Sequence, residues 1–240
     1  MIAKRPLPGT RGARAVLAII LLSVVIVSSP VSASADDRME ADHLVEKARM
    51  AFNTMVADPN MEALVNLVKK GKGVFICPEL LTGAFIIGAS GGSGVFLVRS
   101  DKKGPWSDPA FYTIGEASIG LQIGGEASEV VLVIMTERGV TSLLSSSAKL
   151  GANASIAAGP VGIGASAETA NLSVDIISFS KAKGLYGGVA LSGAVVAVRE
   201  GWNKAYYGKQ VTPIDILIKR NVVNPQAAGL VNAVGKIAGK

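Results

Sequence analysis

The segment from Gly71 to Gly201 has one texture throughout, because small and β-branched apolar residues are interrupted by glycine every few positions. It holds 22 of the 28 glycines in the chain. A strand tolerates an interior glycine where the sheet bends, bulges or lets another backbone approach closely, so this density predicts a strongly curved sheet. Few side chains in the segment are equipped for catalysis, which argues against a conventional enzyme.

Patterns typical of helices lie on both sides of this segment. Apolar residues recur at helical spacing over residues 36–57, and Asp58–Pro59 is a typical start for a second short helix. Near the other end, Thr212–Pro213 and Asn224–Pro225 are also typical helix starts. The order predicts an α+β fold with a Gly-rich, mainly antiparallel sheet, either barrel-like or a sandwich, flanked by N-terminal and C-terminal helices.

Within the glycine-rich segment, β-type patterns predict short strands separated by glycine-rich turns. We expect these strands at residues 74–76, 84–87, 95–99, 112–123, 130–135, 152–169, 174–179 and 187–198. A short helix is expected within 137–150. The runs Gly88–Gly94 and Gly162–Ala167 match loose phosphate-binding patterns, but their β-type flanks favour tight turns or bends.

The first 35 residues predict a secretory signal. Four basic residues precede an apolar run over 15–27, and Ala33-Ser34-Ala35 has the form of a cleavage site. We therefore expect cleavage near Ala35, a single domain over residues 36–240, and a periplasmic or secreted protein of a bacterial envelope. A retained membrane anchor is the alternative, although the run is short for a membrane span.

The charge of the chain is unevenly distributed. Residues 36–180 carry 11 basic and 16 acidic residues, whereas residues 181–240 carry 9 and 2. The basic C-terminal part is either a solvated surface balanced by the acidic part or a patch that faces an anion, and the sequence leaves both open. No nucleic-acid partner is predicted.

The residues that common enzyme mechanisms need are scarce. His43 is the single histidine and Cys77 the single cysteine, so we expect no catalytic residue, no internal disulfide, no metal site and no cofactor. An envelope hydrolase that uses paired carboxylates is a less favoured alternative. Its candidate pairs are Glu126 with Glu129 and Glu168 with Asp175.

Several short fragments follow one another in a specific order and spacing. They include Trp106-Ser107, Gly120–Gly124, Ala157–Gly162, Phe179–Val189 and Tyr206-Tyr207-Gly208. The series from Lys70 to Gly208 resembles the SYLF domain, a lipid-binding module of eukaryotic membrane-trafficking and actin-associated proteins and of secreted bacterial proteins. The resemblance covers nearly all of residues 36–240. It implies a non-enzymatic domain that binds phospholipid or an anionic membrane surface.

Basic residues are the candidates for lipid contact. Lysines lie in two groups, Lys69, Lys70 and Lys72 in the first and Lys181 and Lys183 in the second. Each basic residue near an anionic membrane contributes about 1 kcal/mol, so several matter only when they share one face.

An amphipathic helix supplies the apolar candidates. Phe52 and Met55 lie on the apolar side of the helix expected over 36–57, and this side either inserts into a membrane or packs against the sheet, which we favour. A small outer-membrane β-barrel is a further alternative, because export, glycine and alternating strands all fit it. Such barrels need aromatic girdles, whereas aromatic residues are 5% of this chain.

Overall fold

The computed structural model describes residues 35–84, 87–100, 104–119, 124–163, 173–188 and 191–239. The predicted leader and part of the strand expected over 152–169 lie outside these residues. Among the residues described, no helix is both long enough and apolar enough to cross a membrane.

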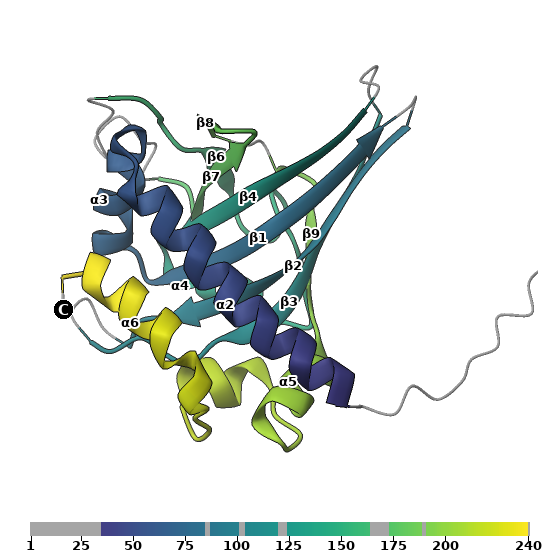
Figure 1. Ribbon diagram of the computed structural model, residues 1–240, viewed down its shortest axis with the longest axis vertical. Helices are drawn as coiled ribbons and strands as arrows, with labels where there is room; N and C mark the ends of the chain where they lie inside the picture. The colour runs from purple at the N-terminus through teal and green to yellow at the C-terminus, as the bar shows by residue number, and fades with distance from the viewer. Residues whose placement is uncertain are drawn as a thin grey trace, which may run out of the picture. The chain divides into compact units, whose positions relative to one another are not determined.

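The described strands form one curled sheet, a half-barrel with helices from both ends of the chain packed on it (Figure 1). The strand order is β5-β9-β3-β2-β1-β4-β7-β6, and β8 pairs with β7. The pairing is antiparallel except between β6 and β7. The strands are β1 (Gly73–Ala84), β2 (Ile87–Val98), β3 (Ala110–Ile119), β4 (Gly124–Ile134), β5 (Ser147–Lys149), β6 (Ile156–Ala158), β7 (Ile176–Ala182), β8 (Leu185–Gly187) and β9 (Val195–Val198). The predicted α+β fold is confirmed.

The helices begin close to the predicted places. They are α2 (Ala35–Ala57), α3 (Glu62–Lys70), α4 (Glu137–Leu144), α5 (Glu200–Tyr207) and α6 (Ala228–Ile237), with short helical turns at Pro59–Met61, Ile214–Ile218 and Pro225–Ala227. Asp58 accepts a hydrogen bond from the Asn60 backbone N–H at 2.8 Å, and Asn224 accepts one from the Gln226 N–H at 3.1 Å. These caps confirm two of the three predicted helix starts, and the turn at Ile214–Ile218 follows the third, Thr212–Pro213. The sequence did not predict α5, because this helix has no side-chain cap that marks its start.

The strands β1 and β2 are longer than predicted, and the expected turn at Gly88–Gly94 is wrong, because these residues lie inside β2. A Cβ atom at Gly92 would lie 2.8 Å from Cys77 Sγ, and one at Gly94 would lie 2.8 Å from the Ile76 carbonyl oxygen. Both distances are too short for real atoms. These glycines therefore mark a close approach of β2 to β1 and do not end the strand.

Half of each central strand is buried on both faces. Along β4, Val131 and Val133 belong to the cluster under α2, α3 and α6, whereas Val130, Leu132 and Ile134 belong to the cluster inside the curl. Period-two alternation sends neighbouring side chains to opposite faces, so a strand buried on both faces is apolar at every position.

A bulge interrupts β1 at Pro78 and Glu79. Cys77 pairs with Val130 of β4 and Leu80 pairs with Ser128, so two residues of β1 oppose one residue of β4. Proline has no N–H for a ladder hydrogen bond and is confined to such irregular places in a central strand. A bulge bends its strand. Beyond it, the far halves of β1, β2 and β4 extend past α2 (Figure 1).

Candidate functional site

The two predicted lysine groups lie at different places on the sheet. Lys69 and Lys70 are exposed at the end of α3, and the Lys72 N–H donates to the Ile134 carbonyl at 2.8 Å. Lys181 pairs with Glu129 of β4 instead. Ile134 and Glu129 are five residues apart on one strand, roughly 17 Å. The structure therefore does not bring the two groups together.

A cavity of about 270 Å³ lies beside the first lysine group. Its lining residues are Lys70, Gly71, Lys72, Arg99, Ser100, Met135 and Glu137. Lys72 Nζ lies 2.6 Å from Glu137 Oε1. Glu137 is the single carboxylate in this lining, against three cationic side chains, so the described wall of the cavity carries an excess of positive charge.

Arg99 is the most buried of these cations, with 6% of its surface exposed. Its guanidinium donates to the Lys69 carbonyl at 3.0 Å and to the Ala238 carbonyl at 3.3 Å. It also lies 5.8 Å from the centre of the Trp106 ring. The two carbonyls are at the ends of α3 and α6, where helix dipoles place partial negative charge. Among the described residues, no carboxylate lies within 4 Å of Arg99.

Cations from the C-terminal part of the chain join this region. Arg220 donates a hydrogen bond at 3.1 Å to the carbonyl of Val98, the last residue of β2. Lys236 lies in the last turn of α6 and lines a neighbouring hollow together with Trp106. We call the set Lys69, Lys70, Lys72, Arg99, Arg220 and Lys236 the basic end. Part of the basic C-terminal segment therefore lies beside the first lysine group.

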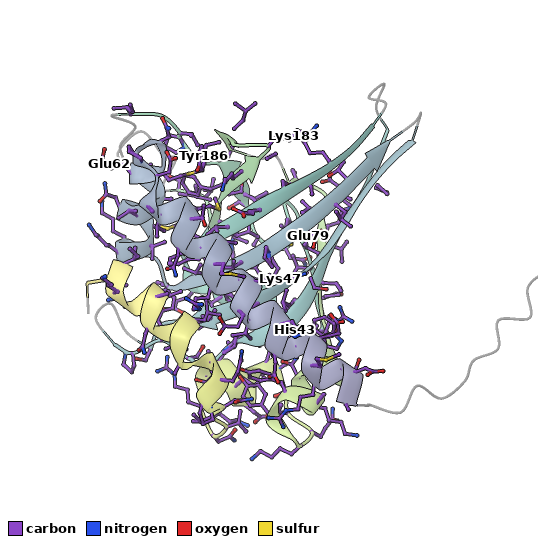
Figure 2. All side chains as sticks on the ribbon, viewed as in Figure 1. His43, Lys47, Glu62, Glu79, Lys183 and Tyr186 are labelled. Carbon is purple, nitrogen blue, oxygen red and sulfur yellow. The ribbon has the colours of Figure 1, made fainter. Side chains whose placement is uncertain are left out.

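The second lysine group lies in a groove. Two hollows of about 230 and 390 Å³ share Lys47, Pro78 and Glu79, and they lie between α2 and the sheet near the bulge. We call them the α2 groove. The charged residues that line it include Glu40, Lys47, Glu79, Glu129, Lys181 and Lys183. Figure 2 shows Lys47 and His43 on α2, with Glu79 on the sheet beside them.

The charges in the α2 groove are only loosely paired. Lys47 Nζ lies 3.8 Å from Glu79 Oε2, and Lys181 Nζ lies 3.7 Å from Glu129 Oε2. Both separations are longer than a hydrogen bond. Glu129 Oε2 is buried and accepts no hydrogen bond from any described residue. Lys183 is exposed, in the turn after β7.

Phe52 and Met55 are not surface residues. Both side chains are fully buried, at 0% exposure, in the cluster between α2 and the sheet. Insertion of these two side chains into a membrane is therefore the wrong interpretation for the folded protein. The alternative that the sequence favoured, core packing, is what the structure has. The large apolar residues that α2 does expose are Met39 and Met50.

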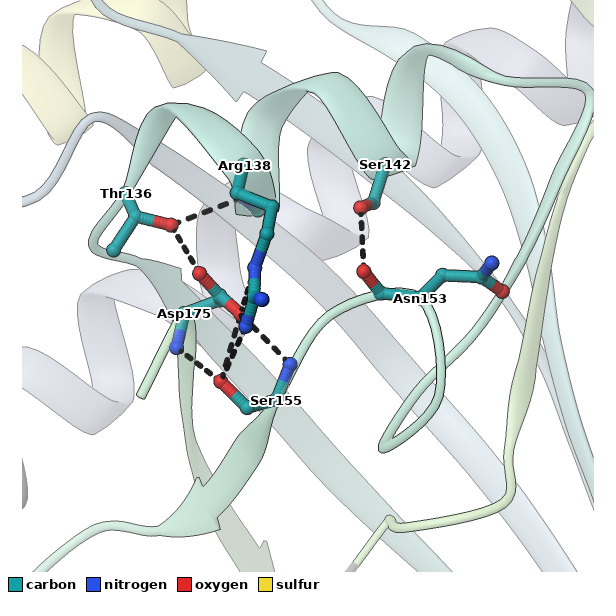
Figure 3. A network of polar contacts seen from close by, with 7 residues as sticks. Thr136, Arg138, Ser142, Asn153, Ser155 and Asp175 are labelled. Carbon is teal, nitrogen blue, oxygen red and sulfur yellow. Dashed lines mark hydrogen bonds and ion pairs between the residues drawn. The ribbon is translucent and has the colours of Figure 1, made fainter. Parts of the chain in front are cut away.

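Asp175 is held in a network of hydrogen bonds and an ion pair (Figure 3). It accepts hydrogen bonds from the Ser155 N–H at 2.8 Å and from Arg138 Nε at 2.9 Å, and Thr136 Oγ1 donates to it as well. The Arg138 guanidinium, together with Thr136 and Ser155, holds the pKa of the Asp175 carboxyl well below its usual range. Its suggested partner, Glu168, lies outside the described residues.

The chain is similar in sequence to a known protein family. A family model described as Ysc84, Las17-binding protein actin regulator, matches residues 115–237. Protein YSC84 from Saccharomyces cerevisiae is 34% identical over 166 residues, which are 67% of this chain and 35% of that protein. LAS seventeen-binding protein 3 from the same species is 33% identical over 159 residues, which are 65% and 34% of the two chains.

A human relative gives a similar match. SH3 domain-containing YSC84-like protein 1 from Homo sapiens is 30% identical over 154 residues, which are 63% of this chain and 44% of that protein. The chain thus spans less than half the length of these three relatives. One of the three names describes a binding protein, and none describes an enzymatic reaction.

Proposed function

Since this chain belongs to the Ysc84 family of SYLF domains, we propose that it binds the anionic surface of a phospholipid membrane through its basic end and catalyses no reaction. The leader-like sequence of residues 1–35 supports a periplasmic or secreted location for this activity.

The observation that carries the proposal is the unbalanced charge around the 270 Å³ cavity. Lys70, Lys72 and Arg99 line it with Glu137 as their one carboxylate. Lys69 and Lys70 are exposed and form no ion pair within 4 Å among the described residues. Phosphate oxygens of lipid head groups accept hydrogen bonds from several ammonium groups at once. A membrane surface therefore fits this end of the protein.

The test is co-sedimentation with vesicles. The protein should bind vesicles that contain phosphatidylglycerol more tightly than vesicles of phosphatidylcholine alone, and high salt should weaken this binding because exposed charges are screened. The double variant Lys69→Glu, Lys70→Glu should bind anionic vesicles at least about tenfold more weakly, since each basic residue contributes about 1 kcal/mol.

The matched control is the double variant Lys204→Glu, Lys209→Glu, which makes the same change of net charge at two exposed lysines, one on α5 and one just after it, outside the basic end. It should bind anionic vesicles almost as the unchanged protein does. Equal, negligible sedimentation with anionic and neutral vesicles would overturn the proposal. An equal loss in the control and in the Lys69→Glu, Lys70→Glu variant would show that net charge alone matters and would overturn the assignment to the basic end.

A further inference from the structure

We propose that the α2 groove binds the head group of a phospholipid that carries a primary ammonium group, as phosphatidylethanolamine does. This site is separate from the basic end and does not need a membrane of net negative charge. Glu79 and Glu129 receive the ammonium group, and Lys181 and Lys183 receive the phosphate.

The ammonium position follows from the bulge in β1. Because Cys77 pairs with Val130 and Leu80 with Ser128, Glu129 of β4 faces the bulged residues Pro78 and Glu79. The bulge thus brings two carboxylates to adjoining places in one groove. Two carboxylates that line one hollow favour a cation there.

Glu129 indicates what kind of cation fits. Its Oε2 atom is buried without a hydrogen bond from the described residues, and the nearest ammonium, Lys181 Nζ, is 3.7 Å away. The Glu129 side chain as a whole is 30% exposed, so a ligand in the groove can reach its carboxylate, and an N–H group donated to this incompletely hydrogen-bonded carboxylate gains free energy. A primary ammonium has three such donors. The quaternary ammonium of phosphatidylcholine has none.

The phosphate position follows from the lysines at the same hollow. Lys181 and Lys183 lie two residues apart at the end of β7, and Lys47 reaches the hollow from α2. Lys183 has no carboxylate within 4 Å among the residues described, so its charge is available to a ligand. The hollow holds three lysines and two glutamates, and a zwitterion with adjacent ammonium and phosphate groups matches this pattern of charge.

The neighbouring part of the groove fits the apolar portion of a lipid. Leu81 and Met50 line the two hollows and are 55% and 53% exposed. Gly91 and Gly92 contribute no side chains to the floor beside Pro78. The hollow of about 390 Å³ is within the size range of small-molecule sites. A head group in this hollow therefore has an apolar surface next to it.

The experiment compares two kinds of neutral vesicle, one of phosphatidylcholine alone and one of phosphatidylcholine mixed with phosphatidylethanolamine. The protein should bind the mixed vesicles about tenfold more tightly, the effect of one charge-assisted hydrogen bond. The variant Glu129→Gln keeps the size of the side chain and should lose this preference. Lys183→Glu, in an exposed turn, should lose it as well.

The double variant Lys69→Glu, Lys70→Glu is the control, because it should keep the preference while losing affinity for anionic vesicles. The two proposals can therefore fail separately. Equal binding of the unchanged protein to both neutral vesicles would overturn the groove site, and this comparison needs no variant. So would a preference that survives in a folded Glu129→Gln protein, or binding of soluble phosphoethanolamine by a protein that does not bind the mixed vesicles.

Discussion

The glycines of β2 differ in what surrounds them, although they are identical as letters in the sequence. At Gly92, an added Cβ would meet Cys77 Sγ at 2.8 Å and the Glu79 carbonyl oxygen even closer. At Gly91, the neighbouring position, nothing lies within 4 Å of such an atom. Gly92 is therefore required by the bulge in β1, whereas Gly91 is not.

This difference predicts the stabilities of two matched variants. Gly92→Ala should lower the free energy of unfolding by about 1–3 kcal/mol, because the methyl group forces β1 and β2 apart. Gly91→Ala should change it little or raise it slightly, since alanine lowers the entropy of the unfolded chain. Urea denaturation followed by circular dichroism measures both. Similar losses in the two variants would contradict the role assigned to Gly92.

At the scale of elements, Asp175 joins three parts of the sheet's inner side. It lies directly before β7. It accepts hydrogen bonds from Thr136 and Arg138 at the start of α4, and from Ser155, the residue directly before β6. Only 3% of Asp175 is exposed. These contacts fix α4 and β6 relative to β7.

The network predicts a pH dependence of stability. The pKa of Asp175 is lowered in the folded state, and an unfolded aspartate titrates near about 3.9, so the contribution is complete above that pH and is lost as the pH falls below it. Asp175→Asn should lower the free energy of unfolding at pH 7 by about 2–4 kcal/mol. The difference between the two proteins should shrink from pH 6 to pH 2.5. Urea midpoints that stay equally far apart across this range would contradict the prediction.

The sequence predicted some elements well and others poorly, for physical reasons. The periodicity of α2 and the caps at Asp58 and Asn224 are local signals, and they were sufficient. The lengths of β1 and β2 were underestimated because glycine is compatible both with a turn and with the close approach that Gly92 makes. The candidate site is less accessible to prediction, since Arg99 binds carbonyls 30 and 139 residues away in the chain.

At the scale of the described unit, the sheet has apolar clusters on both faces, and Cys77 lies in the inner one with 0% exposure. Burial raises the pKa of its thiol to about 12. Since the thiolate is the reactive form, the folded protein presents neither access nor charge at this atom. Cys77 therefore reports on opening of the sheet.

Labelling of Cys77 with a thiol reagent at pH 8 should be slow in the folded protein and fast in concentrated urea. Gly92→Ala should speed labelling by the factor that its change in unfolding equilibrium predicts, when opening is fast relative to the reaction. The rate is followed by absorbance or mass spectrometry. Rapid labelling of the unchanged protein without denaturant would show that the inner cluster is open.

The hydrogen bond from Arg99 to the Ala238 carbonyl holds the C-terminal end of α6 beside the basic end. Gly239 follows directly, so anything fused behind it emerges beside the basic end, whereas Ala35 begins α2 at the end of that helix far from α3 (Figure 1). A reporter placed after residue 240 would crowd the proposed membrane contact, and one placed before Ala35 would not. A tether retained at Ala35 would hold the opposite side of the domain toward its membrane, whereas the cleavage expected from the sequence would leave the basic end free to meet a surface.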